Sequence, residues 1–295
     1  MAPLARLGAF GMLNIMTDQK KRRAADSAGL LAPAITADPE LENHIAFSRV
    51  EILFQPQFNL ASGRIVGVEA LARLPGSDDA RGLFARASAA GLAERLSHMV
   101  QRKALRLAGA WSGALGELGV SINFLPEDIG RAGFADTLLG EIAAAGIDPA
   151  RVTVEITENS LIADDKRVAA RLNRLRGEGV KVAVDDFGTG YASLLYLSTL
   201  PLDGLKIDRG LIDGIEHGES ARVIVRAIIG LARDLNLELA IEGVETAAQL
   251  ALLSEWGCNL YQGFVGARPM TEQALERFVA AHQDTGSGGL ERPAS

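Results

Sequence analysis

The chain has 295 residues, of which 48% are hydrophobic and 23% are charged, a composition typical of a globular protein with a substantial core. Its formal net charge of −7 excludes the basic face with which proteins grip the phosphates of DNA or RNA duplexes. A single cysteine, Cys258, excludes an intramolecular disulfide and fits a reducing cytoplasm, and four scattered histidines exclude a zinc site built from Cys and His.

The N-terminal residues 1–40 show no sustained periodicity, and we expect them to form an extension or linker. Within them, residues 4–16 are mostly apolar and precede a basic cluster at 20–23, which reverses the order of a secretory signal peptide. We interpret residues 4–23 as a docking helix, as a disordered stretch or as a weak anchor at a membrane surface. No apolar run is long enough to predict a membrane-spanning helix.

Strand-like apolar runs alternate with amphipathic helical segments between residues 41 and 283, and a Gly/Ser-rich tail is expected at 284–295. The runs are 50–58, 64–72, 119–125, 151–157, 180–186, 204–208, 237–243 and 258–263. This alternation predicts an α/β fold, the TIM (β/α)8 barrel, and its length is similar to the ~250 residues typical of that barrel. Only residues 59–63 separate the first two runs, too few for a helical crossover, so we expect an antiparallel first hairpin and a modified barrel.

Polar residues interrupt these runs at their C-terminal ends, where barrel strands deliver side chains to the active-site face. They are Glu69, Asn123, Glu155, Asp185, Asp186, Lys206, Glu242 and Gln262. Several acids in one cleft raise one another's pKa unless a countercharge is present, and divalent cations supply one. Carboxylate and amide oxygens suit Mg²⁺ or Mn²⁺, and adjacent aspartates allow one carboxylate to bridge two ions. For any single acid, a solvated loop position is the alternative.

Two metal ions about 3.5–4 Å apart clamp the attacking and leaving oxygens of phosphoryl transfer, so the pattern favours a metal-dependent phosphoesterase. In such a site Lys206 would orient the attacking water or help to deprotonate it. We expect Ca²⁺ to inhibit, because its longer and looser coordination fits poorly where Mg²⁺ works. A barrel enzyme acting on another phosphate ester is an alternative that the fold alone does not exclude.

Seven short motifs occur in order along the chain: VEALARL (68–74), SINF (121–124), EITEN (155–159), DDFGTGYASL (185–194), LKID (205–208), IEGVET (241–246) and QGF (262–264). Together they resemble the EAL-domain family of cyclic-di-GMP phosphodiesterases, over about residues 50–282. The resemblance implies hydrolysis of cyclic di-GMP to linear pGpG with two Mg²⁺ or Mn²⁺ ions. It also implies a bacterial cytoplasmic protein, and contact with the inner membrane through residues 4–23 is a further expectation.

The resemblance also assigns roles to individual residues. It implies one metal site formed by Glu69, Asn123, Glu155 and Asp185, and a second formed by Asp185, Asp186 and Glu242. Lys206 matches the lysine that positions the nucleophilic water, while Gln55 and Arg73 match positions that contact the dinucleotide. Glu158 matches a glutamate that braces the loop beginning at Phe187, and Glu245 and Gln262 match active-site positions with supporting roles. A surface salt bridge is the alternative for Arg73, and a structural amide for Gln262.

The intact motifs favour an active enzyme over its nearest rival, a cyclic-di-GMP receptor with little turnover that signals through a protein partner. The resemblance implies a homodimer with its contact near the loop and helix after DDFGTG, where residues 191–205 are apolar enough to allow it. Because residues 1–40 contain no recognisable sensor domain, we expect regulation by a partner protein, by membrane contact or by dimerisation.

Overall fold

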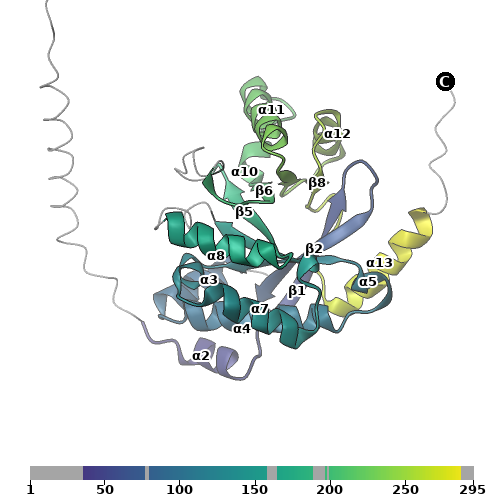
Figure 1. Cartoon of the computed structure of the whole chain (residues 1–295). Helices are drawn as coiled ribbons and strands as arrows, with labels where there is room; N and C mark the ends of the chain where they lie inside the picture. The colour runs from purple at the N-terminus through teal and green to yellow at the C-terminus, as the bar shows by residue number, and fades with distance from the viewer. Residues whose placement is uncertain (1–35, 77–79, 158–164, 189–196, 198, 287–295) are drawn as a thin grey trace, which may run out of the picture.

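The computed structural model of the protein describes residues 36–76, 80–157, 165–188, 197 and 199–286. Its strands form a closed barrel in chain order, with helices packed around the outside (Figure 1). The strands are β1 (Glu51–Asn59), β2 (Ile65–Arg73), β3 (Gly119–Phe124), β4 (Val152–Thr157), β5 (Lys181–Phe187), β6 (Gly204–Ile207), β7 (Glu238–Ile241) and β8 (Leu260–Tyr261). The predicted TIM-like barrel is therefore confirmed.

Strand β1 runs against the direction of the other strands. It pairs antiparallel with β2, with Gln55 opposite Glu69, and antiparallel with β8, with Phe58 opposite Tyr261. The remaining neighbours from β2 to β8 pair in parallel. This arrangement confirms the antiparallel first hairpin, which follows from a connection too short to hold a crossover helix.

The outer layer consists of helices, and the longer ones bury an apolar face. The helices are α2 (Pro39–Ala46), α3 (Ala80–Ala89), α4 (Ala93–Gly109), α5 (Gly113–Gly116), α6 (Pro126–Gly130), α7 (Phe134–Ala145), α8 (Asp165–Gly177), α10 (Arg209–Ile212), α11 (Glu219–Asp234), α12 (Ala247–Glu255) and α13 (Glu272–Gly286), with a 3-10 turn at Pro149–Arg151. In α11 the buried residues Val225, Ile229 and Ala232 follow helical spacing, so one stripe faces the barrel.

The parallel strands are buried on both faces, which explains their nearly continuous apolar sequence. In β5, for example, Val182 and Val184 are fully buried, and so are Val152 and Val154 in β4. Polar side chains enter this interior at the C-terminal ends of the strands. The barrel thus supplies a rigid frame on which the site is built.

The chain enters the fold through α2. Asp38 caps this helix by accepting a hydrogen bond from Leu41 N at 3.0 Å, and Leu41 and Ile45 are buried beneath it. The helix begins at Pro39, inside the extension expected at 1–40, and α13 runs to Gly286, past the expected start of the tail. Among the described residues, no helix combines the length and the apolar character that crossing a bilayer requires.

Candidate metal centre

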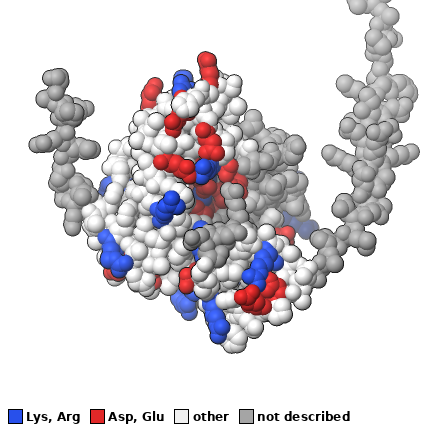
Figure 2. Space-filling view, turned by 180° about the vertical axis from the view of Figure 1, so that it is seen from behind, with Lys and Arg blue, Asp and Glu red and all other residues white. Residues whose placement is uncertain are grey.

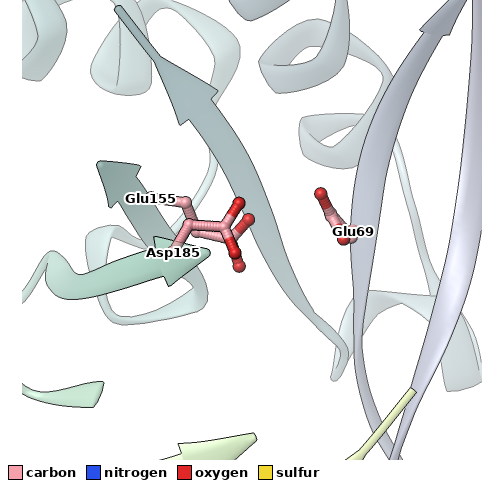
Figure 3. Close-up of side chains that lie close together, drawn as sticks. All are labelled: Glu69, Glu155 and Asp185. Atoms are coloured by element: carbon pink, nitrogen blue, oxygen red, sulfur yellow. The ribbon is translucent and has the colours of Figure 1, made fainter. Parts of the chain in front are cut away.

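Three carboxylates from three different strands face one another inside the mouth of the barrel. Glu69 lies on β2, Glu155 on β4 and Asp185 on β5, and Figure 3 shows their side chains directed into a common space. All three are buried, at 5%, 1% and 7% exposure. Buried carboxylates in such a position require a compensating cation.

Lys206, which projects from β6, provides that cation. Its ammonium Nζ lies 2.9 Å from Glu155 Oε2, 3.3 Å from Glu69 Oε2 and 3.3 Å from Asp185 Oδ1. A fourth carboxylate belongs to Glu242, which follows β7, and its Oε1 lies 2.5 Å from Lys206 Nζ. The angles at this contact do not meet the criteria of a hydrogen bond, so it is an ion pair only. One buried ammonium is therefore shared by four acids.

The charge imbalance shows in the acid–base equilibria of the cluster. Burial opposes the charged form of Lys206, but the surrounding carboxylates, Asp185 first, outweigh it and raise the pKa of Lys206 well above its usual range. Burial raises the pKa of Glu155 well above its usual range, against the pull of Lys206. Burial, with repulsion from Asp185 and Glu69, likewise raises the pKa of Glu242 to about 8. The cluster holds more negative charge than one lysine balances.

Asp186 joins the site through an irregular backbone. Neighbouring residues of a regular strand point to opposite faces, which would send Asp185 and Asp186 apart. Asp186 instead adopts a left-handed conformation with φ +55°, and the pairing of β5 with β6 shifts register between Val184 and Phe187. Aspartate tolerates this conformation better than most residues, and such bulges occur beside active sites.

Amide side chains connect the acids to β1, β3 and β8. Asn123 donates a hydrogen bond to Glu69 Oε1 at 2.8 Å, and Gln262 donates to Glu69 Oε2 at 2.6 Å. Gln262 also donates to Gln55 Oε1 at 3.1 Å, and Gln55 in turn donates to the carbonyl of Ala267 at 3.1 Å. Both oxygens of Glu69 are therefore held in place by neutral donors.

The side chains present fit a pair of divalent cations. Glu69, Glu155 and Asp185 bring carboxylate oxygens within 4.8 Å of one another, and so do Asp185, Asp186 and Glu242. The two groups share Asp185, and every donor is an oxygen, the type that Mg²⁺, Mn²⁺ and Ca²⁺ prefer. Glu242 Oε1 is buried and pairs with the Lys206 ammonium, so its charge already faces the position that a cation would take.

Beside the acids lies a cavity of about 310 Å³. Its lining includes Arg73 and Phe84, and it reaches Asn123 and Asp186 at the edge of the metal centre. A larger cavity of about 630 Å³ lies against α4 and α7, in the outer layer, and contains none of the predicted site residues. The cavity of about 310 Å³ is therefore placed to receive a ligand beside the acid cluster.

Two of the residues singled out by sequence do not join this cluster. Glu245 lies at the rim, where its carboxylate pairs with the guanidinium of Arg209. Glu158 lies outside the described residues. Arg209 was not predicted from the sequence. A signal was present, because Arg209 follows Lys206 by three residues just as Glu245 follows Glu242 by three residues after the next strand.

Figure 2 shows acidic side chains gathered near the middle of one face of the molecule, with basic side chains among them. An anionic substrate that approaches such a surface is repelled unless bound cations reverse the local charge. The distribution of charge therefore agrees with a site that works with metal ions.

Comparison with known proteins places this architecture among characterised relatives. Residues 39–269 match the family profile described as EAL domain. The cyclic di-GMP phosphodiesterase NbdA of Pseudomonas aeruginosa is 37% identical over 254 residues, which cover 83% of this chain and 32% of NbdA. The bifunctional diguanylate cyclase/cyclic di-GMP phosphodiesterase MucR of the same organism is 36% identical, covering 77% of this chain and 34% of MucR. The chain thus spans about a third of the length of these relatives.

Solved structures give the same grouping. The PaMucR phosphodiesterase in complex with c-di-GMP superposes with a TM-score of 0.74 at 34% identity, covering 80% of this chain and 98% of that one. Klebsiella pneumoniae BlrP1 superposes with a TM-score of 0.68 at 31% identity, and the match covers 75% of this chain and 56% of the BlrP1 chain. BlrP1 has been solved with c-di-GMP in both a calcium and a manganese complex.

Proposed function

We propose, on the premise that this chain belongs to the EAL-domain family, that it hydrolyses one phosphodiester of cyclic di-GMP to give linear pGpG. The observation that carries the proposal is the convergence of Glu69, Glu155, Asp185 and Glu242 on a single buried point in the barrel mouth. The relative NbdA, named as a cyclic di-GMP phosphodiesterase, supports the choice of substrate.

The reaction requires two Mg²⁺ or Mn²⁺ ions in this proposal. Glu69, Asn123, Glu155 and Asp185 would hold one ion, and Asp185, Asp186 and Glu242 the other. Bound ions would polarise the scissile phosphate and lower the pKa of an attacking water. Burial of the acids serves this purpose, because electrostatic attraction to a cation is stronger where water is excluded.

The other side chains would bind and orient. The Lys206 ammonium, held among the acids, would donate a hydrogen bond to the attacking water and fix its direction. Arg73 lines the adjacent cavity, and its guanidinium would contact the dinucleotide. The planar guanidinium can donate two parallel hydrogen bonds, which suits a phosphate or the edge of a guanine. Gln262 would keep Glu69 oriented, and Gln55, which accepts a hydrogen bond from Gln262, would act at the same end of the site.

The proposal is tested by incubating the purified chain with cyclic di-GMP and Mg²⁺ or Mn²⁺ and separating the products by chromatography. We expect pGpG as the product, with no product after chelation or in the Glu69→Ala variant. Leu74→Ala, in which a half-buried residue next to the EAL motif loses an apolar contact, serves as a matched control for protein quality.

The second candidate function is a receptor that binds cyclic di-GMP with little turnover and signals through a protein partner. The cavity beside the acids, lined by Arg73, is the observation that favours it, because such a cavity can bind a dinucleotide whether or not the bond is hydrolysed. Calorimetric binding of cyclic di-GMP with no pGpG at micromolar enzyme would favour the receptor.

We also expect a homodimer, in which the contact involves the loop and helix after DDFGTG, in residues 191–205. Residues 191–196 and 198 of this region lie outside the described residues. Among the described residues, helix α11 exposes Val223 and Ile224, at 62% and 49%. Light scattering with size exclusion, with and without cyclic di-GMP, would show twice the chain mass, and a fixed monomer would contradict this expectation.

A further inference from the structure

A second ion pair lies above the buried one at the junction of β6 and β7. Lys206 and Arg209 are three residues apart on the segment that leaves β6, and Glu242 and Glu245 are three residues apart on the segment that leaves β7. The two strands are parallel neighbours, and Glu242 N donates to Ile207 O at 3.0 Å. Lys206 pairs with Glu242 inside the mouth, and Arg209 pairs with Glu245 at the rim.

Arg209 makes contacts along its whole length. Its guanidinium donates to both carboxylate oxygens of Glu245, with Nη2 3.3 Å from Oε2, and its Nε donates to Asp213 Oδ1 at 3.2 Å. Its aliphatic part lies over Gly243, where an added Cβ would come within 2.5 Å of Arg209 Cβ and 2.7 Å of Cγ. Gly243 has φ +65°, so the residue after Glu242 turns directly beneath the arginine.

The segment that carries Glu242 is fixed at its other points by backbone hydrogen bonds. Val244 N donates to Gln262 O at 3.1 Å, and Glu245 N donates to the side chain of Gln249 at 2.9 Å. Thr246 then caps α12, accepting from Gln249 N at 3.0 Å. Between these bonds lies Gly243, which has no side chain of its own, and the three atoms nearest to the position of its missing Cβ all belong to the Arg209 side chain.

We propose that Arg209 is a positioning residue: by bridging to Glu245 and covering Gly243, it holds the Glu242 carboxylate in the geometry that the second metal ion needs. The inference rests on the proposed function, because it assigns Glu242 to that ion. It also gives Glu245 a role at the site without placing its carboxylate among the metal ligands.

The competing explanation is an ordinary surface salt bridge. Such pairs contribute little to stability, and these side chains are 48% and 36% exposed. The two explanations differ in what they predict. A surface bridge affects neither metal binding nor catalysis, whereas loss of a residue that orients a ligand costs about ten- to a hundredfold in metal affinity or activity.

The test is a titration of the metal-free chain with Mn²⁺ by calorimetry, for wild type, Arg209→Ala, Arg209→Lys and Glu245→Gln. We expect the Mn²⁺ affinity of the weaker site to fall about ten- to a hundredfold in Arg209→Ala and in Glu245→Gln. Arg209→Lys keeps the positive charge but cannot donate two parallel hydrogen bonds to the carboxylate, so its Mn²⁺ affinity should fall between those of wild type and Arg209→Ala. The charge-swapped double variant, Arg209→Glu with Glu245→Arg, should recover most of the affinity.

Arg176→Ala provides the matched control. The Arg176 guanidinium also donates hydrogen bonds to both carboxylate oxygens of an acid, Asp203, and these side chains are similarly exposed, at 36% and 29%. Asp203 precedes β6 and so lies at the opposite end of the barrel, and the Mn²⁺ affinity of this variant should equal that of wild type. Melting temperatures of all variants would confirm that they are folded.

Unchanged Mn²⁺ affinity in Arg209→Ala and Glu245→Gln would overturn the inference. An equal loss in the single variants and in the swapped double variant would overturn it as well, because it would show that the pairing itself is not what matters. A wild type that binds two Mn²⁺ ions but leaves cyclic di-GMP intact would remove the proposed function and leave the positioning role of Arg209 standing.

Discussion

Lys206 sets the charge balance of the metal-free site. It is 2% exposed, and its ammonium lies within ion-pair distance of Glu69, Glu155, Asp185 and Glu242. Because removing one partner of a buried ion pair leaves the other uncompensated, Lys206→Met should destabilise the metal-free protein by about 3–5 kcal/mol at neutral pH. Thermal or urea unfolding in EDTA measures this cost.

Mn²⁺ should then raise the melting temperature of Lys206→Met more than that of wild type, because the ion no longer competes with an ammonium. Hydrolysis should stay low, since we propose that Lys206 orients the attacking water. Lys181→Met is the control: that side chain is 52% exposed and 3.7 Å from Glu238, so its loss should change stability by less than about 1 kcal/mol. Equal stability of all three proteins in EDTA would contradict this account of Lys206.

Cys258 is buried just before β8, and the pH dependence of unfolding can report the burial of its thiol. Burial raises the pKa of its thiol from 9.0 to about 12, against the opposing charge of Arg233. The folded chain therefore keeps a proton that the unfolded chain releases between about pH 9 and 12, and the unfolding free energy falls as pH rises through that window. The slope from this group reaches at most about 1.4 kcal/mol per pH unit.

The Cys258→Ala variant should lose that part of the slope in urea unfolding between pH 8 and 10. As the chain has one cysteine, its reaction with a thiol reagent reports this position alone. At pH 8 the folded protein should react slowly and the urea-unfolded protein quickly, because the thiolate is the reactive form. Rapid reaction of the folded protein would show that the thiol is exposed.

At the scale of elements, the reversed strand β1 carries two buried aromatic side chains, Phe54 and Phe58. Phe54 is fully buried and packs edge-on against Trp111, with ring centroids 5.0 Å apart. Its backbone also exchanges hydrogen bonds with Met270. Phe54→Ala should lower the unfolding free energy by about 3–5 kcal/mol, as expected for a fully buried ring.

Phe47→Ala makes the same chemical change on a ring that is 66% exposed, and should alter stability by no more than about 0.5 kcal/mol. Urea unfolding of both variants gives the comparison. A similar effect in the two variants would show that β1 is not held by this packing.

The elements were largely predictable because barrel strands carry strong apolar runs with polar residues at their ends. The same pattern located Glu69, Glu155, Asp185, Lys206 and Glu242 at one mouth before any geometry was known. Side-chain direction was harder to predict. The left-handed backbone of Asp186 depends on a register shift against β6, and no local sequence rule predicts it.

The pairing of Arg209 with Glu245 depends on tertiary structure in the same way. The two residues are distant in sequence and meet because β6 and β7 are neighbours in the barrel. Spacing alone left Glu245 as one more acid near the site, and only the fold separates it from the ligands. The sequence could therefore locate the centre of the site, while its supporting contacts required the structure.

At the scale of the whole molecule, the metal centre joins strands from opposite sides of the barrel. Glu69 on β2 faces Glu155 and Asp185 on β4 and β5, and Glu242 follows β7. An ion held between strands by either group of these carboxylates would bind the folded chain and not the unfolded one, so it should stabilise the fold by about 2.7 kcal/mol at a free concentration of 100 times its Kd. Melting curves with and without Mn²⁺ measure this.

Calcium should separate this stabilisation from catalysis. Ca²⁺ accepts the same oxygen ligands, so it should raise the melting temperature as Mn²⁺ does. Its longer bonds and variable coordination should leave the phosphate and the water poorly aligned, so Ca²⁺ alone should give little pGpG and should inhibit the Mn²⁺-loaded chain competitively. Full turnover with Ca²⁺ would contradict the metal assignment, whereas stabilisation without turnover would show that geometry, more than charge neutralisation, limits the reaction.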